Sequence, residues 1–146
     1  MKDFQYFINQ KIVRKQNPNK ARADFLIKEA EQNYSFLLEM VDKIGVSEKN
    51  ANNFVKNSYD MFMGLIRAKM FLEGYISSGF GAHEAEISYM KVLGFNEKDV
   101  QFADKIRFFR NGMLYYGTIL DKEYAEKVIV FTKNLFFKLK RILNLK

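Results

Sequence analysis

The sequence is poor in the residues that build disulfides and metal sites. Its 146 residues include no cysteine, one histidine, one proline and no tryptophan. Without cysteine the chain forms no disulfide and no thiolate metal site, and a reducing cytoplasm is its natural setting. With a single histidine and no His-Glu-x-x-His or paired-carboxylate pattern, no metal ligand set is predicted.

Signatures of cofactors and membranes are missing as well. Gly79-Phe80-Gly81 follows a predicted helix and lacks the Lys-Ser/Thr pair or the third glycine of nucleotide-binding loops, so no cofactor is expected. No apolar run approaches the ~18 residues of a membrane span, and the opening segment does not resemble a signal peptide. We therefore predict a cytoplasmic protein with no membrane partner.

Acidic residues are outnumbered by basic ones. The chain carries 24 Lys and Arg against 17 Asp and Glu, for a net charge of +7. This balance favours acidic partners such as RNA or nucleotides, although many proteins that bind neither share it.

The scarcity of proline and the helical spacing of the hydrophobic residues indicate an all-α protein. We predict a five-helix, mostly antiparallel up-and-down bundle without β-sheet, formed as a single domain by residues 19–146. Residues 1–18 are expected to be a short basic segment that docks on the bundle, with Asn17 capping the first long helix before Pro18. The predicted helices cover residues 19–44, 48–76, 83–93, 96–117 and 121–143, and Asp121 is expected to cap the last of them. The second is apolar nearly all round and is therefore predicted to be central.

The predicted helix 96–117 begins with a complete start signal. Asn96 is a cap, and Phe95 before it is expected to contact Val100 one turn later. One face then carries apolar residues at helical spacing, which need a core to bury them. This stripe consists of Phe102, Ile106, Phe109, Met113 and Tyr116.

The opposite side of the same helix is unusual for a solvated face, which would carry lysine and glutamate. We expect this second sector to lie at a homodimer interface, because a large apolar patch on a monomer is otherwise hard to explain. The alternative is a helix buried on both sides. The sector consists of Asp104, Phe108, Asn111 and Tyr115.

The run Arg110-Asn111-x-x-x-Tyr115 resembles the signature of the HEPN (higher eukaryotes and prokaryotes nucleotide-binding) domain, an all-helical family. Nuclease members carry an arginine, often followed by asparagine or aspartate, and a histidine four to six residues further on. Here Tyr115 or Tyr116 occupies the position of that histidine. The similarity is to archaeal members and covers roughly residues 20–143. Upstream matches are Tyr59, Ala68-Lys69, Gly74 and a loop leading to His83-Glu84.

The resemblance implies metal-independent chemistry on RNA in a cleft between two subunits. Such cleavage needs a base for the 2′-hydroxyl, a cation for the phosphorane and a group that holds the phosphate. By resemblance Arg110 is the cation and Asn111 the positioning group, while Tyr115 donates to phosphate or stacks on a base.

Other ligand-binding candidates each have two interpretations. His83 either supplies the missing imidazole or is a local capping residue. Arg67 either lines the site or forms a salt bridge on the helix flank. Arg107 and Tyr116 complete the predicted ligand-binding set.

Three functions stay open at this point. The first is a nucleotide- or RNA-binding HEPN-like protein with an altered motif, as part of a toxin–antitoxin or nucleotidyltransferase pair. The second is an active ribonuclease toxin that uses Arg110, Asn111 and Tyr115, and the third is a purely structural helical interaction protein. The missing motif histidine favours binding or partnership over catalysis.

Overall fold

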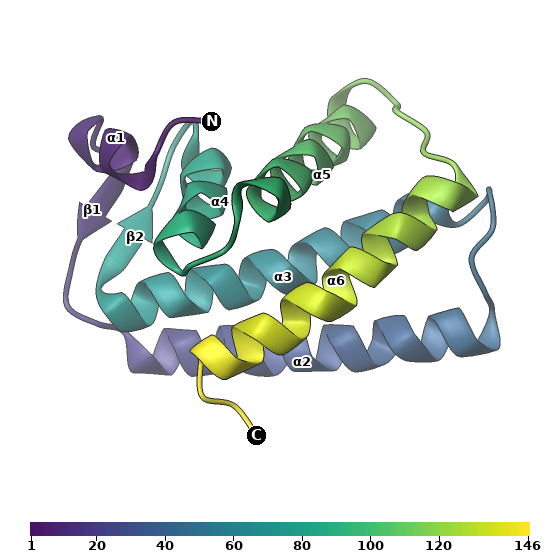
Figure 1. Cartoon of the computed structure of the whole chain (residues 1–146), viewed down its shortest axis with the longest axis horizontal. Coiled ribbons are helices and arrows are strands. Elements are labelled where there is room, and N and C mark those ends of the chain that lie inside the picture. Colours follow the sequence, from purple (N-terminus) through teal and green to yellow (C-terminus); the bar gives the residue numbers. More distant parts are fainter.

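The computed structural model describes all 146 residues as six helices and one two-stranded sheet (Figure 1). None of the helices combines the length and the hydropathy that a membrane crossing requires. In chain order the elements are α1 (Phe4–Asn9), β1 (Val13–Lys15), α2 (Lys20–Lys43), α3 (Ala51–Glu73), β2 (Tyr75–Ser77), α4 (Ala82–Val92), α5 (Glu97–Tyr115) and α6 (Lys122–Ile142).

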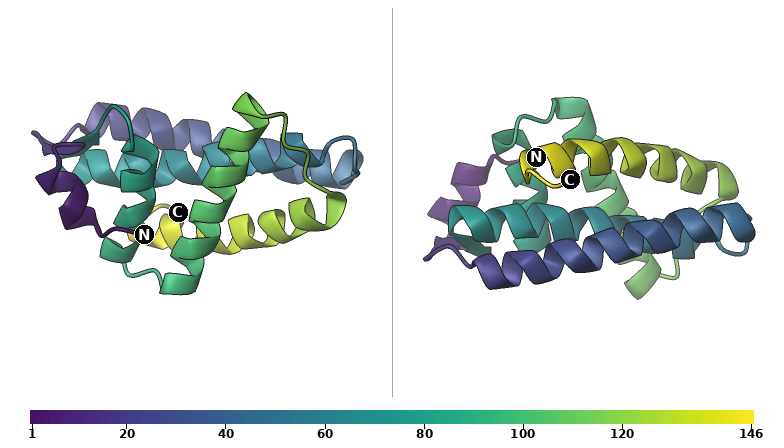
Figure 2. Two further views of the ribbon diagram at one scale, coloured as in Figure 1. Left: turned by 90° about the horizontal axis from the view of Figure 1, so that it is seen from above. Right: turned by 90° about the horizontal axis from the view of Figure 1, so that it is seen from below.

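The helices form two groups that run in different directions. Helices α2, α3 and α6 lie along the long axis of the molecule, whereas α4 and α5 lie across them (Figure 2). The predicted all-α class is confirmed, but the five-helix up-and-down bundle is not. Crossing angles depend on how side-chain ridges of two helices fit together, which helical spacing alone does not reveal.

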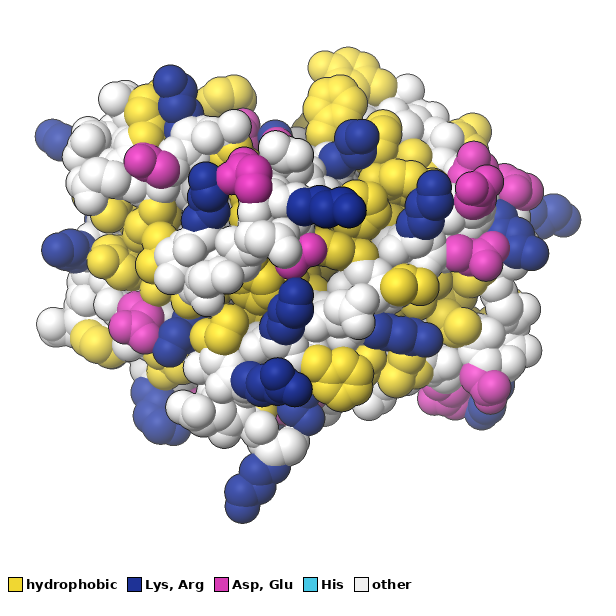
Figure 3. Space-filling model, viewed as in Figure 1, with side chains coloured by type: hydrophobic (Ala, Val, Ile, Leu, Met, Phe, Trp, Pro, Cys, Tyr) yellow, Lys and Arg dark blue, Asp and Glu magenta, His cyan; other side chains and the backbone are white.

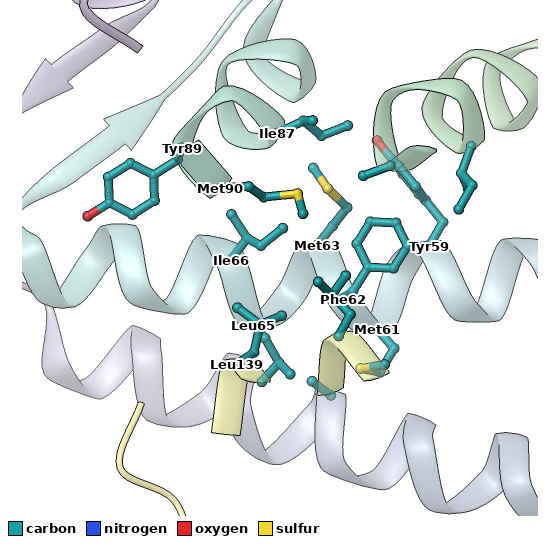
Figure 4. Close-up of a cluster of buried hydrophobic side chains, with 14 of the residues drawn as sticks. Tyr59, Met61, Phe62, Met63, Leu65, Ile66, Ile87, Tyr89, Met90 and Leu139 are labelled. Atoms are coloured by element: carbon teal, nitrogen blue, oxygen red, sulfur yellow. The ribbon is translucent and has the colours of Figure 1, made fainter. Parts of the chain in front are cut away.

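Helix α3 is the centre of the molecule, as its sequence predicts. It packs against α2, α4, α5 and α6, so little of its surface meets solvent. Figure 4 shows Met61, Phe62 and Leu65 of α3 within this core, together with Met90 of α4 and Leu139 of α6. Each of these five side chains is at most 1% exposed. The apolar circumference of α3 therefore reflects contacts on several sides.

A short antiparallel sheet joins the N-terminal segment to the chain after α3, and the prediction of no β-sheet was wrong. Val13 pairs with Ser77, and Lys15 pairs with Tyr75. Gly74 ends α3 with a φ of +82°, and a Cβ there would lie 2.6 Å from the carbonyl oxygen of Gln16. Only glycine fits this approach, so α3 ends at Glu73 and not at residue 76.

Side-chain caps set most of the helix starts. Asn96 accepts from the Asp99 amide at 2.8 Å, and Asp121 accepts from the Tyr124 amide at 2.8 Å, as predicted. Asn19, and not Asn17, caps α2 by accepting from the Arg22 amide. The cap therefore follows Pro18 instead of preceding it.

The start of α3 is later than predicted. Asn50 accepts a hydrogen bond from the Ser47 amide and donates one to the Gly45 carbonyl. These two bonds hold residues 45–50 in a turn, which delays the helix from the predicted residue 48 to Ala51.

Candidate functional site

A pocket of about 310 Å³ lies where α3, α4 and α5 meet. Four predicted site residues from three different helices line it together, namely Arg67, His83, Arg110 and Asn111. Tyr59, Asp60, Met63 and Leu114 complete its lining. Residues 67, 83 and 110 are far apart in the sequence. The crossing of α5 over α3 brings these groups together.

Arg110 is the cation of this pocket with the fewest partners. Its side chain is 20% exposed, and its Nη2 lies 3.8 Å from Oδ1 of Asp60. Its Nε and Nη1 are buried and have no hydrogen-bond partner within the protein. Buried donors without an acceptor are costly, and a guanidinium presents its donors in a fork that suits an anion.

Arg67, in contrast, is fully engaged by a carboxylate. Its Nε donates to Glu86 Oε2 at 2.7 Å, and its Nη2 donates to Oε1 at 2.9 Å. Ser77 donates a further hydrogen bond to Glu86 at 2.9 Å. Of the two interpretations of Arg67, the ion pair is therefore present, and the residue lines the pocket as part of that pair.

Glu86 is a buried carboxylate that the sequence analysis missed. Its side chain is 4% exposed. Burial raises its pKa, but hydrogen bonds from Arg67 and His83 and the charge of Arg67 outweigh burial and lower the pKa to about 2. A signal was available in the sequence: Glu86 is the one acidic residue in a run that is otherwise apolar or small, from Ala85 to Met90.

His83 belongs to the same network and remains accessible. Its Nδ1 lies 3.0 Å from Glu86 Oε1, and its side chain is 58% exposed. Since Nδ1 is held by Glu86, Nε2 is the nitrogen left to meet a ligand. The carboxylate thus orients the imidazole, as second partners orient functional histidines in many sites.

Tyr59 forms part of the wall of the pocket. It is 6% exposed and extends from α3 toward α5 (Figure 4). Burial, and then the charge of Glu86, raises its pKa above the ordinary tyrosine value. The phenol therefore stays protonated and offers a neutral donor.

Three predicted ligand-binding or catalytic residues do not line this pocket. Arg107 is 16% exposed, with its Nε 2.7 Å from Asp104 Oδ1 and its Nη2 3.7 Å from Glu84. Tyr115 and Tyr116 are 75% and 87% exposed. The placing of Tyr116 in the core stripe was wrong, because α5 ends at Tyr115 and the helical spacing does not continue past it.

The predicted dimer face is partly an exposed apolar surface. Phe108 is 66% exposed and Tyr115 is 75% exposed. In Figure 3 hydrophobic side chains gather over the C-terminal end of α5. Asp104 is half-buried in its ion pair with Arg107, and Asn111 is half-buried at the pocket. Phe108 and Tyr115 are therefore the members of the predicted interface that a second copy would meet first.

The residues offer no metal centre, since no three histidine or acidic side chains are grouped closely enough to hold an ion. No protein-family model, curated protein or solved structure matches this chain. The chemistry of the pocket is therefore the basis for any functional conclusion.

Proposed function

We propose that the pocket at Arg110 binds phosphate groups of RNA or of a nucleotide, and that the protein is a HEPN-like binding protein. The observation that carries this proposal is the guanidinium of Arg110, which lines the pocket and has no carboxylate within hydrogen-bonding distance. Arg67 is already neutralised by Glu86. A bound phosphate would supply the acceptors that Arg110 lacks, and Asn111 would add an amide donor.

The surroundings of the pocket support an anionic ligand. The chain has a net charge of +7, which attracts polyanions and speeds their association. Asp60 is the one acidic side chain near Arg110 in the pocket, and its Oδ1 is 3.8 Å from Nη2, too far for a hydrogen bond. By the resemblance to HEPN proteins, Arg110 and Asn111 are also the residues expected to contact phosphate.

The test replaces Arg110 and measures RNA binding and folding separately. We expect Arg110→Ala to weaken binding of single-stranded RNA by ~1.5–3 kcal/mol, the range for a hydrogen bond to a charged group. Arg110→Lys should recover only part, because an ammonium lacks the planar fork. Fluorescence anisotropy gives the affinity, and thermal melting followed by circular dichroism gives the stability.

The matched control is Arg141→Ala, which removes an exposed arginine from the far end of α6 and causes the same loss of net charge. If both alanine variants bind equally weakly, net charge and not the pocket explains binding. An Arg110→Ala protein that melts early yet binds RNA normally would assign Arg110 a structural role and refute the proposal.

A second function, metal-independent RNA cleavage, is favoured by the oriented imidazole. In this scheme His83 Nε2 takes the proton of a 2′-hydroxyl, and the 2′-oxygen attacks the adjacent phosphorus. The 5′-oxygen leaves, taking a proton from water, and a 2′,3′-cyclic phosphate remains. Arg110 stabilises the phosphorane. Tyr115 has no part in this scheme, because it lies outside the pocket.

Cleavage is tested with labelled RNA in the presence of a chelator. The cyclic phosphate product should form with the wild type and should be lost, by at least ~100-fold in rate, in His83→Ala. Tyr115→Phe should retain full activity. Cleavage that depends on Tyr115 and not on His83 would contradict this assignment, and the absence of cleavage leaves binding as the function.

A further inference from the structure

A groove between α2 and α3, termed the α2–α3 groove, adjoins the pocket at Arg110. Its volume is about 550 Å³, within the ~300–1,000 Å³ of small-molecule sites. Phe36 and Met40 of α2 and Ile44, which follows that helix, contribute apolar surface, and Asn53, Asn57 and Asp60 of α3 contribute polar groups. Asp60 also lines the Arg110 pocket, so the two hollows share a wall.

The two sides of the groove differ in chemistry. On the α2 side, Phe36 is 51% exposed and Ile44 is 64% exposed, so a flat apolar face is available to a ligand. Across from them stand side chains with amide donors and acceptors. A ligand with an aromatic plane and a hydrogen-bonding edge matches this pair of walls, and nucleobases have that form.

The start of α3 is rich in asparagine, and its asparagines divide into two kinds. Asn50 holds the turn before the helix, and Asn52 donates to the Thr118 carbonyl and accepts from the Leu120 amide. Asn53 and Asn57, one helical turn apart, line the groove together with Asn50, but no hydrogen bond within the protein engages the side chains of Asn53 and Asn57. Structural bonding therefore explains the first pair and leaves the second pair for a ligand.

The arrangement also suits the length of a nucleotide. Asn53 and Asp60 lie on the same helix, about 10 Å apart along its axis at ~1.5 Å per residue. Asp60 stands 3.8 Å from Arg110. A nucleotide whose ring lies beside Asn53 and Asn57 would extend past the carboxylate of Asp60 to bring its phosphate to the Arg110 pocket.

We propose that the α2–α3 groove is a nucleobase subsite of the Arg110 pocket. The base stacks on Phe36, its edge meets Asn53 and Asn57, and its phosphate reaches Arg110. This inference rests on the proposed function and specifies it: the ligand is single-stranded, because a paired and stacked base has no free face or edge to offer.

The experiment compares a short single-stranded RNA with an abasic ribose–phosphate oligomer of the same length, by fluorescence anisotropy. The wild type should bind the RNA about tenfold more tightly, within the range of base–aromatic stacking. Phe36→Ala and Asn57→Ala should each lose most of that preference while binding the abasic oligomer as the wild type does. Phe25→Ala is the matched control, because Phe25 is a 63% exposed phenylalanine of α2 outside the groove.

The outcomes separate this inference from the proposed function. If the wild type binds both oligomers equally and Arg110→Ala weakens both, the subsite is refuted and phosphate binding stands. If the wild type binds neither, the proposed function fails and the subsite fails with it. A wild-type dimer that Phe36→Ala dissociates would assign the groove to a second copy and overturn the subsite. Thermal melts check that each variant is folded. If Phe36→Ala does not fold, Asn57→Ala is the variant that tests the subsite.

Discussion

The buried ion pair between Arg67 and Glu86 allows a quantitative prediction for Glu86→Gln. The substitution keeps the shape of the side chain but removes the negative charge of Glu86, whose Oε2 lies 2.7 Å from Nε of Arg67. The pKa of Glu86 falls from 4.5 to about 2 in the folded protein. Such a decrease corresponds to about 3 kcal/mol of stabilisation of the charged form. We therefore expect Glu86→Gln to lower the free energy of unfolding by ~3 kcal/mol near neutral pH, and the Tm by about 6–12 °C.

The sign of the pH dependence follows from the depressed pKa. Above the unfolded pKa of 4.5, Glu86 is charged in both states and its full contribution to stability is present. As the pH falls toward about 2, the unfolded chain takes up a proton that the folded protein does not. The wild type therefore loses up to ~1.4 kcal/mol per pH unit from this group. Because Glu86→Gln has no such group, the stability difference between the two proteins should narrow over that window.

The assay is urea unfolding followed by far-ultraviolet circular dichroism, at about pH 7, 5 and 3. Other carboxylates titrate in both proteins, so the difference between the two curves isolates Glu86. Glu126→Gln, which removes an exposed carboxylate on α6, is the control and should cost under ~0.5 kcal/mol. A loss in Glu86→Gln that is the same at all three pH values would show that hydrogen-bond geometry, and not charge, supplies the stabilisation.

Two further predictions concern assembly and the backbone. The wild type should be a dimer by light scattering at micromolar concentration and Phe108→Glu a monomer, because Phe108 is 66% exposed on the predicted dimer face; a monomeric wild type would contradict this. Gly74→Ala should lower the unfolding free energy by ~1–3 kcal/mol or more, because φ is +82° and the new Cβ would lie 2.6 Å from Gln16. The control Gly94→Ala shares a positive φ but meets no atom within 4 Å, so it should cost less by the same chemical denaturation.

The sequence predicted those parts of the fold that depend on local signals. Asn96 and Asp121 cap their helices as expected, because a cap needs only the amide three residues later. The central place of α3 also followed from its own composition. The sheet could not be predicted in this way, because Val13 and its partner Ser77 are separated in the sequence by the whole of α2 and α3. Three residues of strand carry too weak a pattern to reveal a pairing over that separation.

The candidate site was likewise predictable where neighbouring residues form a motif, and not where it depends on contacts between residues far apart in the sequence. The motif directed attention to Arg110 and Asn111, and the structure places both in one pocket with His83 and Arg67. The partner Glu86 was missed, because a glutamate in a helix is ordinarily solvated and its burial depends on where α4 crosses α3. Whether Arg110 contacts phosphate stays a prediction.

Three arginines were predicted to lie near the site, and they differ in how completely carboxylates neutralise their charge. Arg67 shares two hydrogen bonds with a buried carboxylate, so a ligand would have to compete with Glu86 for it. Arg107 bonds Asp104 at 2.7 Å and approaches Glu84, which ties α5 to α4. Arg110 alone keeps buried donors without an acceptor, and its nearest carboxylate is beyond hydrogen-bonding distance. An anion that enters this pocket therefore gains most from Arg110, while the other two arginines hold the helices that position it.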